Sequence, residues 1–196
     1  MVEISHRVPE PAELVAFRAE HPSFGPADFD SPAFQSIKRQ IKRKLSQDQS
    51  GLCAYCESIL KDDDGQVDHI KPRRGAQAHP NLTFVYTNFA HSCVSAKHCG
   101  QKKGDHLLPI EPRSGCNARF TLSTDGFLDA DRNQSPEQQK EARLTRDLLG
   151  LNHPDLVLER KQWLESALSF LEELETMYPA FMAAAPFRHT LKRILP

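Results

Sequence analysis

The sequence predicts an α+β protein, in which a small core with clustered cysteines and short strands lies between helical segments. Four of its five cysteines fall into two pairs, Cys53 with Cys56 and Cys93 with Cys99. The chain between the pairs has the pattern of strand, loop, strand and helix, and apolar residues recur at helical spacing on both sides of this block. A chain of 196 residues is long enough for one domain, or for one domain with appended helices.

We expect the chain to divide into a helical segment, a core and a second helical segment, at residues 1–49, 50–120 and 121–196. A short helix over 10–20 and an amphipathic helix over 32–48 are expected in the first segment, with Ser31 and Pro32 as the N-cap and first position of the longer helix. Five cations and no anion lie within residues 38–44. They form either an ordinary solvated face or a surface that meets phosphate groups.

The C-terminal segment carries its own helix signals. Ser135 and Gln138 have the spacing of a capping box, which predicts a helix to about Leu149, with Gly150 as its stop. A turn is expected at 124–126. A longer helix over 154–178 has its leucines on one side, a face that either packs into the core or binds a partner.

Composition excludes several classes of protein. Hydrophobic residues make up 39% of the chain and charged residues 26%, as in ordinary globular proteins. No apolar run approaches the length of a membrane span, and the N-terminus lacks the basic start and apolar stretch of a secretory signal. We therefore expect a cytoplasmic protein without membrane contact. The net charge of −1 gives no global signature of nucleic-acid binding.

The cysteine pairs indicate a metal site. Two thiolates in a Cys-x2-Cys turn can reach one tetrahedral ion, and Cys93 and Cys99 could complete it from a second loop. Four thiolates leave no open position, so the site would hold structural zinc. The alternatives are buried free cysteines or a redox pair. Cys116 has no partner and is expected to be a small buried residue.

An Asp-His pair lies between the cysteine pairs. Asp68 and His69 belong to a predicted strand over 67–70, and a second strand is expected over 82–86. Adjacent residues of a strand point to opposite faces, but at a strand end both can reach one site. A carboxylate binds Mg²⁺ or Mn²⁺, and a neutral imidazole can take a proton from water. Hydrolysis of a phosphodiester needs both.

The order of these residues resembles the HNH endonuclease family, whose pattern is Cys-x2-Cys, Asp-His-Ile-x-Pro, an Asn, a second Cys pair and a Lys. The match covers residues 51–105 and implies a ββα-metal core stapled by zinc. A longer resemblance, over about 50–161, is to the PtuB-like nuclease subunit of Septu-type anti-phage systems, which is also found with some retrons. It implies a partner ATPase of the ABC/SMC-like class (PtuA-like).

The resemblance implies a role for each matching residue. His69 would be the general base, Asp68 would bind the catalytic Mg²⁺ or Mn²⁺, and Asn88 would brace the loop that carries His69. Many family members place Asn or His directly after the last cysteine as a second metal ligand, whereas this chain has Gly100. The candidates to replace it are His98, Gln101, Asp105 and His106, of which Asp105 is preferred because a carboxylate suits a hard cation.

Cations near the motif are either ordinary solvated charges or, as we prefer beside a nuclease site, residues that contact the phosphate backbone without reading sequence. They are Lys71, Arg73, Arg74, Lys102 and Lys103. The function expected is that of a metal-dependent HNH endonuclease that acts on phage or foreign DNA, with RNA as an alternative substrate. The competing hypothesis is a non-catalytic zinc module that binds nucleic acid or a protein partner, and Gly100 is the feature that favours it.

Overall fold

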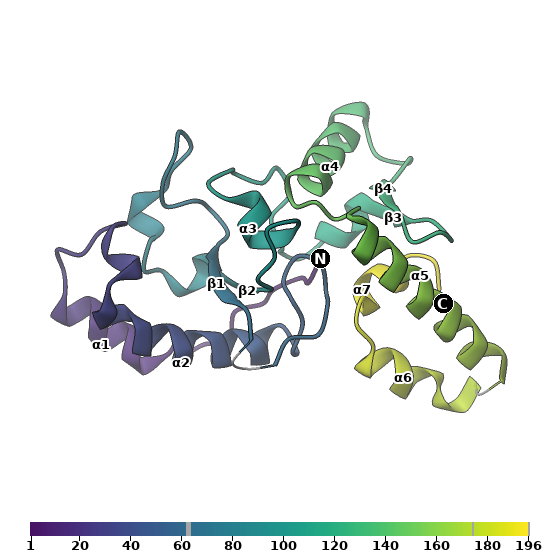
Figure 1. The fold of residues 1–196 in the computed structure, drawn as a ribbon, viewed down its shortest axis with the longest axis horizontal. Coiled ribbons are helices and arrows are strands. Elements are labelled where there is room, and N and C mark those ends of the chain that lie inside the picture. The colour runs from purple at the N-terminus through teal and green to yellow at the C-terminus, as the bar shows by residue number, and fades with distance from the viewer. Residues whose placement is uncertain (62–63, 174, 196) are drawn as a thin grey trace.

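The computed structural model has the α+β architecture that the sequence predicts, with two small sheets and helices toward both ends of the chain (Figure 1). It describes residues 1–61, 64–173 and 175–195. The helices and strands in chain order are α1 (Ala12–Glu20), α2 (Pro32–Asp48), β1 (Gln66–His69), β2 (Phe89–Ser92), α3 (Cys99–Lys103), β3 (Phe120–Leu122), β4 (Leu128–Ala130), α4 (Pro136–Leu148), α5 (Pro154–Glu173), α6 (Tyr178–Ala184) and α7 (Arg188–Leu191).

A ββα unit forms the centre of the molecule. Strands β1 and β2 pair antiparallel, with Asp68 opposite Ala90 and His69 opposite Phe89, and α3 follows. The predicted strand over 67–70 is confirmed to within a residue. The predicted strand over 82–86 is wrong. Its backbone closes local turns instead, because the Val85 N–H bonds the Leu82 carbonyl and the Asn88 N–H bonds the Val85 carbonyl.

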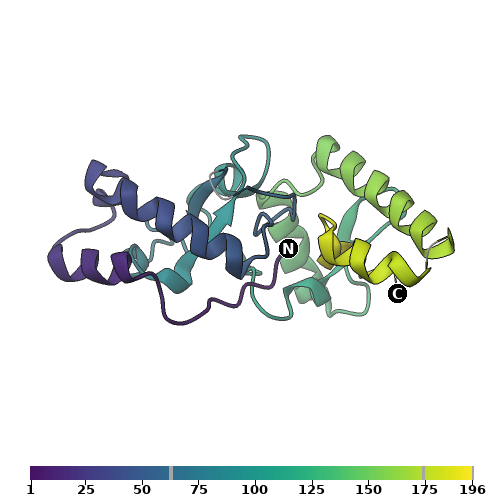
Figure 2. The same cartoon turned by 90° about the horizontal axis from the view of Figure 1, so that it is seen from below.

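An aromatic-rich core joins the N-terminal helices to this unit. Helices α1 and α2 pack against each other, and α2 runs beside both strands (Figure 2). The cluster consists of Leu14, Phe17, Phe29, Phe34, Ile41, Leu45, Tyr86 and Phe89. The bounds predicted for α2 are confirmed, and Pro32 is its first residue. Ser31 occupies the N-cap position, but its side chain makes no capping hydrogen bond.

The described residues of the C-terminal third form a hairpin and helices α4 to α7. The expected turn at 124–126 connects β3 to β4, and the capping box of α4 is formed by Ser135 and Gln138 as predicted. Gly150 follows α4 at a φ of +59°, a conformation that glycine adopts readily. The helix predicted over 154–178 ends earlier, at Glu173; a new helix starts at Tyr178, where Pro179 lies in the first turn. Leu174, one of the leucines on the predicted apolar side of this helix, lies outside the described residues.

A second core connects distant parts of the chain. It contains residues from the N-terminus, the first cysteine turn, the β3–β4 hairpin and helices α4 to α7. Glu57 adds polar contacts to it, because its carboxylate accepts hydrogen bonds from His189 N at 2.9 Å and from Thr190 Oγ1 at 2.6 Å. Each core draws on more than one of the three predicted segments, whose boundaries stay a prediction. Among the described residues, no helix is both long and apolar enough for a membrane crossing.

Candidate functional site

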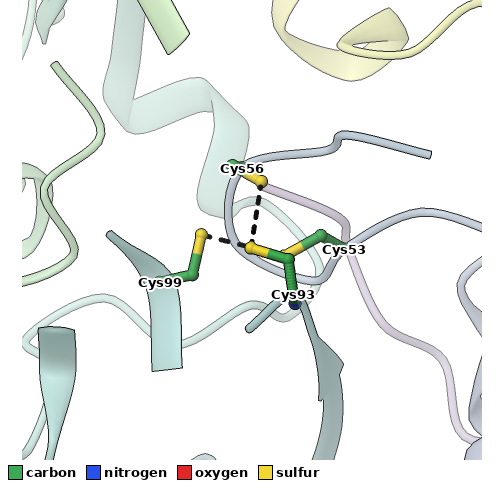
Figure 3. A group of neighbouring side chains, drawn as sticks. All are labelled: Cys53, Cys56, Cys93 and Cys99. Atoms are coloured by element: carbon green, nitrogen blue, oxygen red, sulfur yellow. Dashed lines mark hydrogen bonds between the residues drawn. The ribbon is translucent and has the colours of Figure 1, made fainter. Parts of the chain in front are cut away.

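The four paired cysteines form one cluster. Cys53 and Cys56 lie in the turn after α2, Cys93 follows β2, and Cys99 begins α3, so the cluster fastens both ends of the ββα unit. The side chains point toward one another (Figure 3), and their sulfur atoms all lie within 4.8 Å of one another. The cluster could hold a metal ion.

The sulfur separations decide between a metal and a disulfide. Cys53 Sγ lies 3.8 Å from Cys99 Sγ, and Cys56 Sγ lies 3.9 Å from Cys93 Sγ. A disulfide needs about 2.05 Å. Tetrahedral zinc with Zn–S bonds of about 2.3 Å places its ligands about 3.8 Å apart. The geometry therefore fits zinc and excludes a disulfide here.

The neighbouring sulfurs favour a thiolate at Cys93, whereas burial raises the pKa of Cys99 well above its usual range. Hydrogen bonds from the neighbouring thiols, that of Cys53 first, hold the pKa of Cys93 well below its usual range. His98 Nδ1 lies 3.3 Å from Cys99 Sγ and 3.6 Å from Cys93 Sγ, which places His98 beside the sulfurs. Cys116 is buried apart from the cluster, and burial raises the pKa of its thiol to about 11.

His69 is the last residue of β1 and is held in a defined orientation. Its Nε2 lies 2.9 Å from the carbonyl oxygen of Thr83, which can only accept, so Nε2 carries the proton and Nδ1 is the basic nitrogen. The ring packs between Phe29 and Phe89, at centroid distances of 4.3 and 5.3 Å. One tautomer and one ring plane are thereby selected.

The charge state of His69 suits a proton acceptor. Its pKa is lowered from 6.5 to about 4, first by burial and then by the nearby cations Arg73, Lys103 and Lys38, although the Thr83 hydrogen bond raises it. The imidazole is therefore neutral at neutral pH. A phosphate group in the site would offset these cations and bring the pKa back toward the range of an efficient base.

Asp68 is held by two neighbours that sequence reasoning did not identify as its partners. The Tyr55 hydroxyl donates to Asp68 Oδ2 at 2.5 Å, and Lys103 Nζ lies 3.3 Å from the same oxygen. Desolvation raises the pKa of Asp68 despite these contacts. A carboxylate is the ligand type that Mg²⁺ and Mn²⁺ prefer, so the residue fits a hard cation.

Asn88 clamps the chain directly after His69. Its Oδ1 accepts from Lys71 N at 2.9 Å, and its Nδ2 donates to Lys71 O at 3.0 Å and to Leu82 O at 3.3 Å. The Asn88 carbonyl also accepts from Ile70 N. This is the location that the predicted bracing role requires, since both sides of the His69 loop are tied to one buried side chain.

Asp68 and His69 line the same cavity, of about 490 Å³, although they are neighbours on a strand. His69 is the terminal residue of β1, so both side chains border the opening. The cavity is lined by five cations against three carboxylates. They are Lys38, Arg39, Lys42, Arg73 and Lys103 against Asp30, Asp68 and Asp105. The excess of positive charge suits a polyanion.

Three of these cations come from α2, which settles where its basic face lies. The sequence left open whether that face is merely solvated, and the structure brings Lys38, Arg39 and Lys42 to the cavity that contains Asp68 and His69. Their spacing in the sequence could have predicted that they share one side of the helix, because residues 38 and 39 lie four and three positions before residue 42.

The basic residues predicted near the motif are placed differently. Arg73 lines the cavity, and its Nη2 lies 2.5 Å from Asp30 Oδ2. Lys71 instead forms an ion pair with Glu111, with Nζ 3.6 Å from Oε1. Arg74 and Lys102 are exposed, and neither lines the cavity. Lys103 is a correction: its side chain is 1% exposed, and its ammonium donates to the His69 carbonyl at 2.8 Å. It holds the end of β1 and is too buried to meet a phosphate backbone.

The candidates for a second metal ligand are spread over the region. His98 lies at the cysteine cluster, where it cannot serve Asp68, and His106 is exposed without lining the cavity. Gln101 and Asp105 do line the cavity. Asp105 lies against the Gly75 loop, since a Cβ added to Gly75 would be 3.1 Å from Asp105 Cβ.

This fold and site define a class of protein: a ββα unit fastened by four cysteines, with Asp and His at the end of its first strand. No protein-family model matches the chain. It is 36% identical, over 204 residues that cover 99% of both chains, to a protein of Vibrio cholerae serotype O1 biovar El Tor named "Retron Vc95 putative HNH endonuclease". The chain belongs to the HNH endonuclease family, as its motifs predict.

Proposed function

We propose that this protein is a metal-dependent endonuclease that hydrolyses phosphodiester bonds of phage or foreign DNA, with RNA as the alternative substrate. One observation carries the proposal. Asp68 and His69, a metal-binding group and a neutral base, open into a single cavity lined by Lys38, Arg39, Lys42 and Arg73 as well as by the buried Lys103. Such a cavity attracts the phosphate backbone and presents it to both groups.

The four clustered cysteines hold structural zinc in this proposal. All four tetrahedral positions are taken by thiolates, so the ion stabilises the fold and takes no part in the reaction. Because the cysteines flank the ββα unit on both sides, the ion fixes α3 against β1 and β2.

The reaction follows from the orientation of His69. Nδ1 accepts a proton from water, because Nε2 is held by the Thr83 carbonyl, and the resulting hydroxide attacks phosphorus. Arg39 and Arg73 position the phosphate in the cavity. Asp68, oriented by Tyr55 and Lys103, would hold a divalent cation, which would supply stabilisation for the charge on the departing 3′ oxygen. Asn88 keeps His69 in place.

The biological setting is proposed from resemblance. The Vibrio cholerae relative is named as part of a retron, and the longer sequence resemblance is to PtuB-like subunits of Septu anti-phage systems. We therefore place this protein in the cytoplasm, in anti-phage defence, beside an ABC/SMC-like ATPase. Co-purification with the product of a neighbouring ATPase gene supports this setting, and a monodisperse monomer in the mixture counts against it.

A second candidate function has its own observation. Gly100 offers no ligand, and the Lys103 ammonium already lies 3.3 Å from Asp68. A zinc module that binds nucleic acid or a protein without cutting would share both features.

The experiment incubates zinc-loaded protein with plasmid DNA and with total RNA, in Mg²⁺, Mn²⁺ or EDTA, alone and with the neighbouring ATPase. Cleavage that needs the divalent metal supports the nuclease and identifies the sugar. Binding without cleavage, in every mixture, supports the module and overturns the nuclease.

A further inference from the structure

Position 100 is surrounded by polar side chains and has no room for one of its own. A Cβ added to Gly100 would lie 2.9 Å from Gln66 Nε2, 3.0 Å from Ser92 Oγ and 3.1 Å from Asp68 Cγ. The place from which many family members extend a second ligand is thus occupied by groups from the hairpin. Position 100 therefore could not take Asn or His unless one of these neighbours moved.

Gln66 is the neighbour that fits a metal. Gln66 and Asp68 are two residues apart on β1, so their side chains leave the same face of the strand, toward α3. Both line the cavity that His69 borders. An amide oxygen is a hard ligand of the type that Mg²⁺ and Mn²⁺ accept beside a carboxylate.

The other neighbour is already engaged. Ser92 Oγ accepts from Gly100 N at 3.1 Å and donates to Cys93 O at 3.2 Å. Among the described residues, the side-chain amide of Gln66 has no hydrogen-bond partner. Its oxygen and nitrogen exchange by a half-turn of the last torsion, so either atom can face Asp68.

We infer that Gln66 is the second protein ligand of the catalytic divalent cation, in the place of the side chain that Gly100 lacks. The inference rests on the proposed nuclease function and names a residue for its metal site. The ligand has moved from helix α3 to strand β1, and Gly100 is the residue that leaves space for it.

The test measures Mn²⁺ binding to the full-length, zinc-loaded protein, from the electron paramagnetic resonance signal of free Mn²⁺. Gln66→Ala should weaken Mn²⁺ at least about tenfold, since even groups that only support a ligand are worth that much. Gln66→Glu should bind Mn²⁺ at least as tightly as the wild type. Gln101→Ala removes a matched amide from the same cavity and should change nothing, and the same holds for Asp105→Asn.

A double variant checks the geometry. Gln66→Ala removes the group closest to position 100, so adding Gly100→Asn should restore part of the Mn²⁺ affinity that Gln66→Ala loses. Zinc content and melting temperature of every variant should match the wild type. If the double variant folds normally but regains no Mn²⁺ affinity, that result counts against the inference that Gln66 replaces a ligand at position 100.

The outcomes separate this inference from the proposed function. Wild-type affinity in Gln66→Ala, with metal-dependent cleavage intact, overturns the inference alone. Weakening by Asp105→Asn but not by Gln66→Ala assigns the ligand to Asp105 instead. A wild type that neither binds Mn²⁺ nor cleaves any nucleic acid overturns both.

Discussion

Removal of zinc should unfold the central part of the molecule. Structural zinc contributes about 10–16 kcal/mol of apparent binding free energy at pH 7, whereas a whole domain is stabilised by about 5–15 kcal/mol. The energy of the ion is therefore as large as the total stability. Cys53, Cys56 and Cys99 are all at most 3% exposed and belong to the larger core, so the loss of the ion would spread beyond the two turns.

The assay combines metal analysis with thermal melting followed by circular dichroism. The purified protein should contain one zinc per chain, and a strong chelator should abolish the cooperative transition or lower the melting temperature by tens of degrees. Cys56→Ser should lose zinc and fold poorly. Cys116→Ser is the matched control, because Cys116 is buried apart from the cluster, and its zinc content should equal that of the wild type.

Two results would refute the zinc assignment. One is purified protein that melts cooperatively without any bound zinc. The other is an unchanged melting temperature after the metal has been shown to be removed.

Three further predictions concern the cleft. Arg39→Ala should lower the slope of log DNA affinity against log salt concentration by about 0.9, the value of one phosphate contact. Arg43→Ala, on the same helix but away from the cavity, should leave that slope unchanged. Equal slopes for both variants would show that α2 does not contact DNA. Asn88→Ala leaves the backbone N–H and C=O of Lys71 without their hydrogen-bond partner. It should lower the free energy of unfolding, measured by urea titration, by about 1–3 kcal/mol. An unchanged free energy of unfolding would show that these hydrogen bonds do not stabilise the fold. The His69 ring, with its pKa of about 4, should stay neutral in NMR spectra from pH 8 down to about 5.5. At pH 5.5 an unperturbed histidine, with a pKa of about 6.5, is mostly protonated. A titration midpoint of His69 at pH 6.5 would contradict the effect of burial on its pKa.

Local patterns predicted the parts of the fold whose signals are contained in a few residues. The capping box of Ser135 and Gln138, the bounds of α2 and the strand through Asp68 and His69 all depend on neighbours in sequence. The four cysteines were also predictable, because thiolate pairs at metal spacing have few other uses. In each case the sequence pattern that predicts the element consists of the same residues that form it.

The rest depends on contacts between distant residues. The apolar run at 82–86 suits a strand, yet Tyr86 is buried in the cluster formed with α1 and α2, and the strand begins three residues later, at Phe89 in β2. The hairpin of β3 and β4 has only three residues in each strand, too few for an alternating pattern. The burial of Lys103 could not be predicted either, because it follows from the position of Asp68 and His69 beside α3.

Only the motif residues of the candidate site could be predicted from the sequence, because the rest of the site also depends on contacts between distant residues. Motif residues were identified one by one, but the cavity is completed by α2 and by Gln66, which no motif contains. Strand alternation could have pointed to Gln66, since it lies two residues before Asp68 and shares its face.

The measurement that tests the central claim most directly is cleavage of supercoiled plasmid by His69→Ala beside the wild type, in Mg²⁺ or Mn²⁺, alone and with the proposed ATPase partner. A general base contributes about 10²–10⁴ in rate, so His69→Ala should lose cleavage by that factor while zinc content and melting temperature stay unchanged. His69→Gln, which retains a donor for the Thr83 carbonyl but no base, should lose cleavage equally. Cleavage at the wild-type rate by either variant would contradict the account.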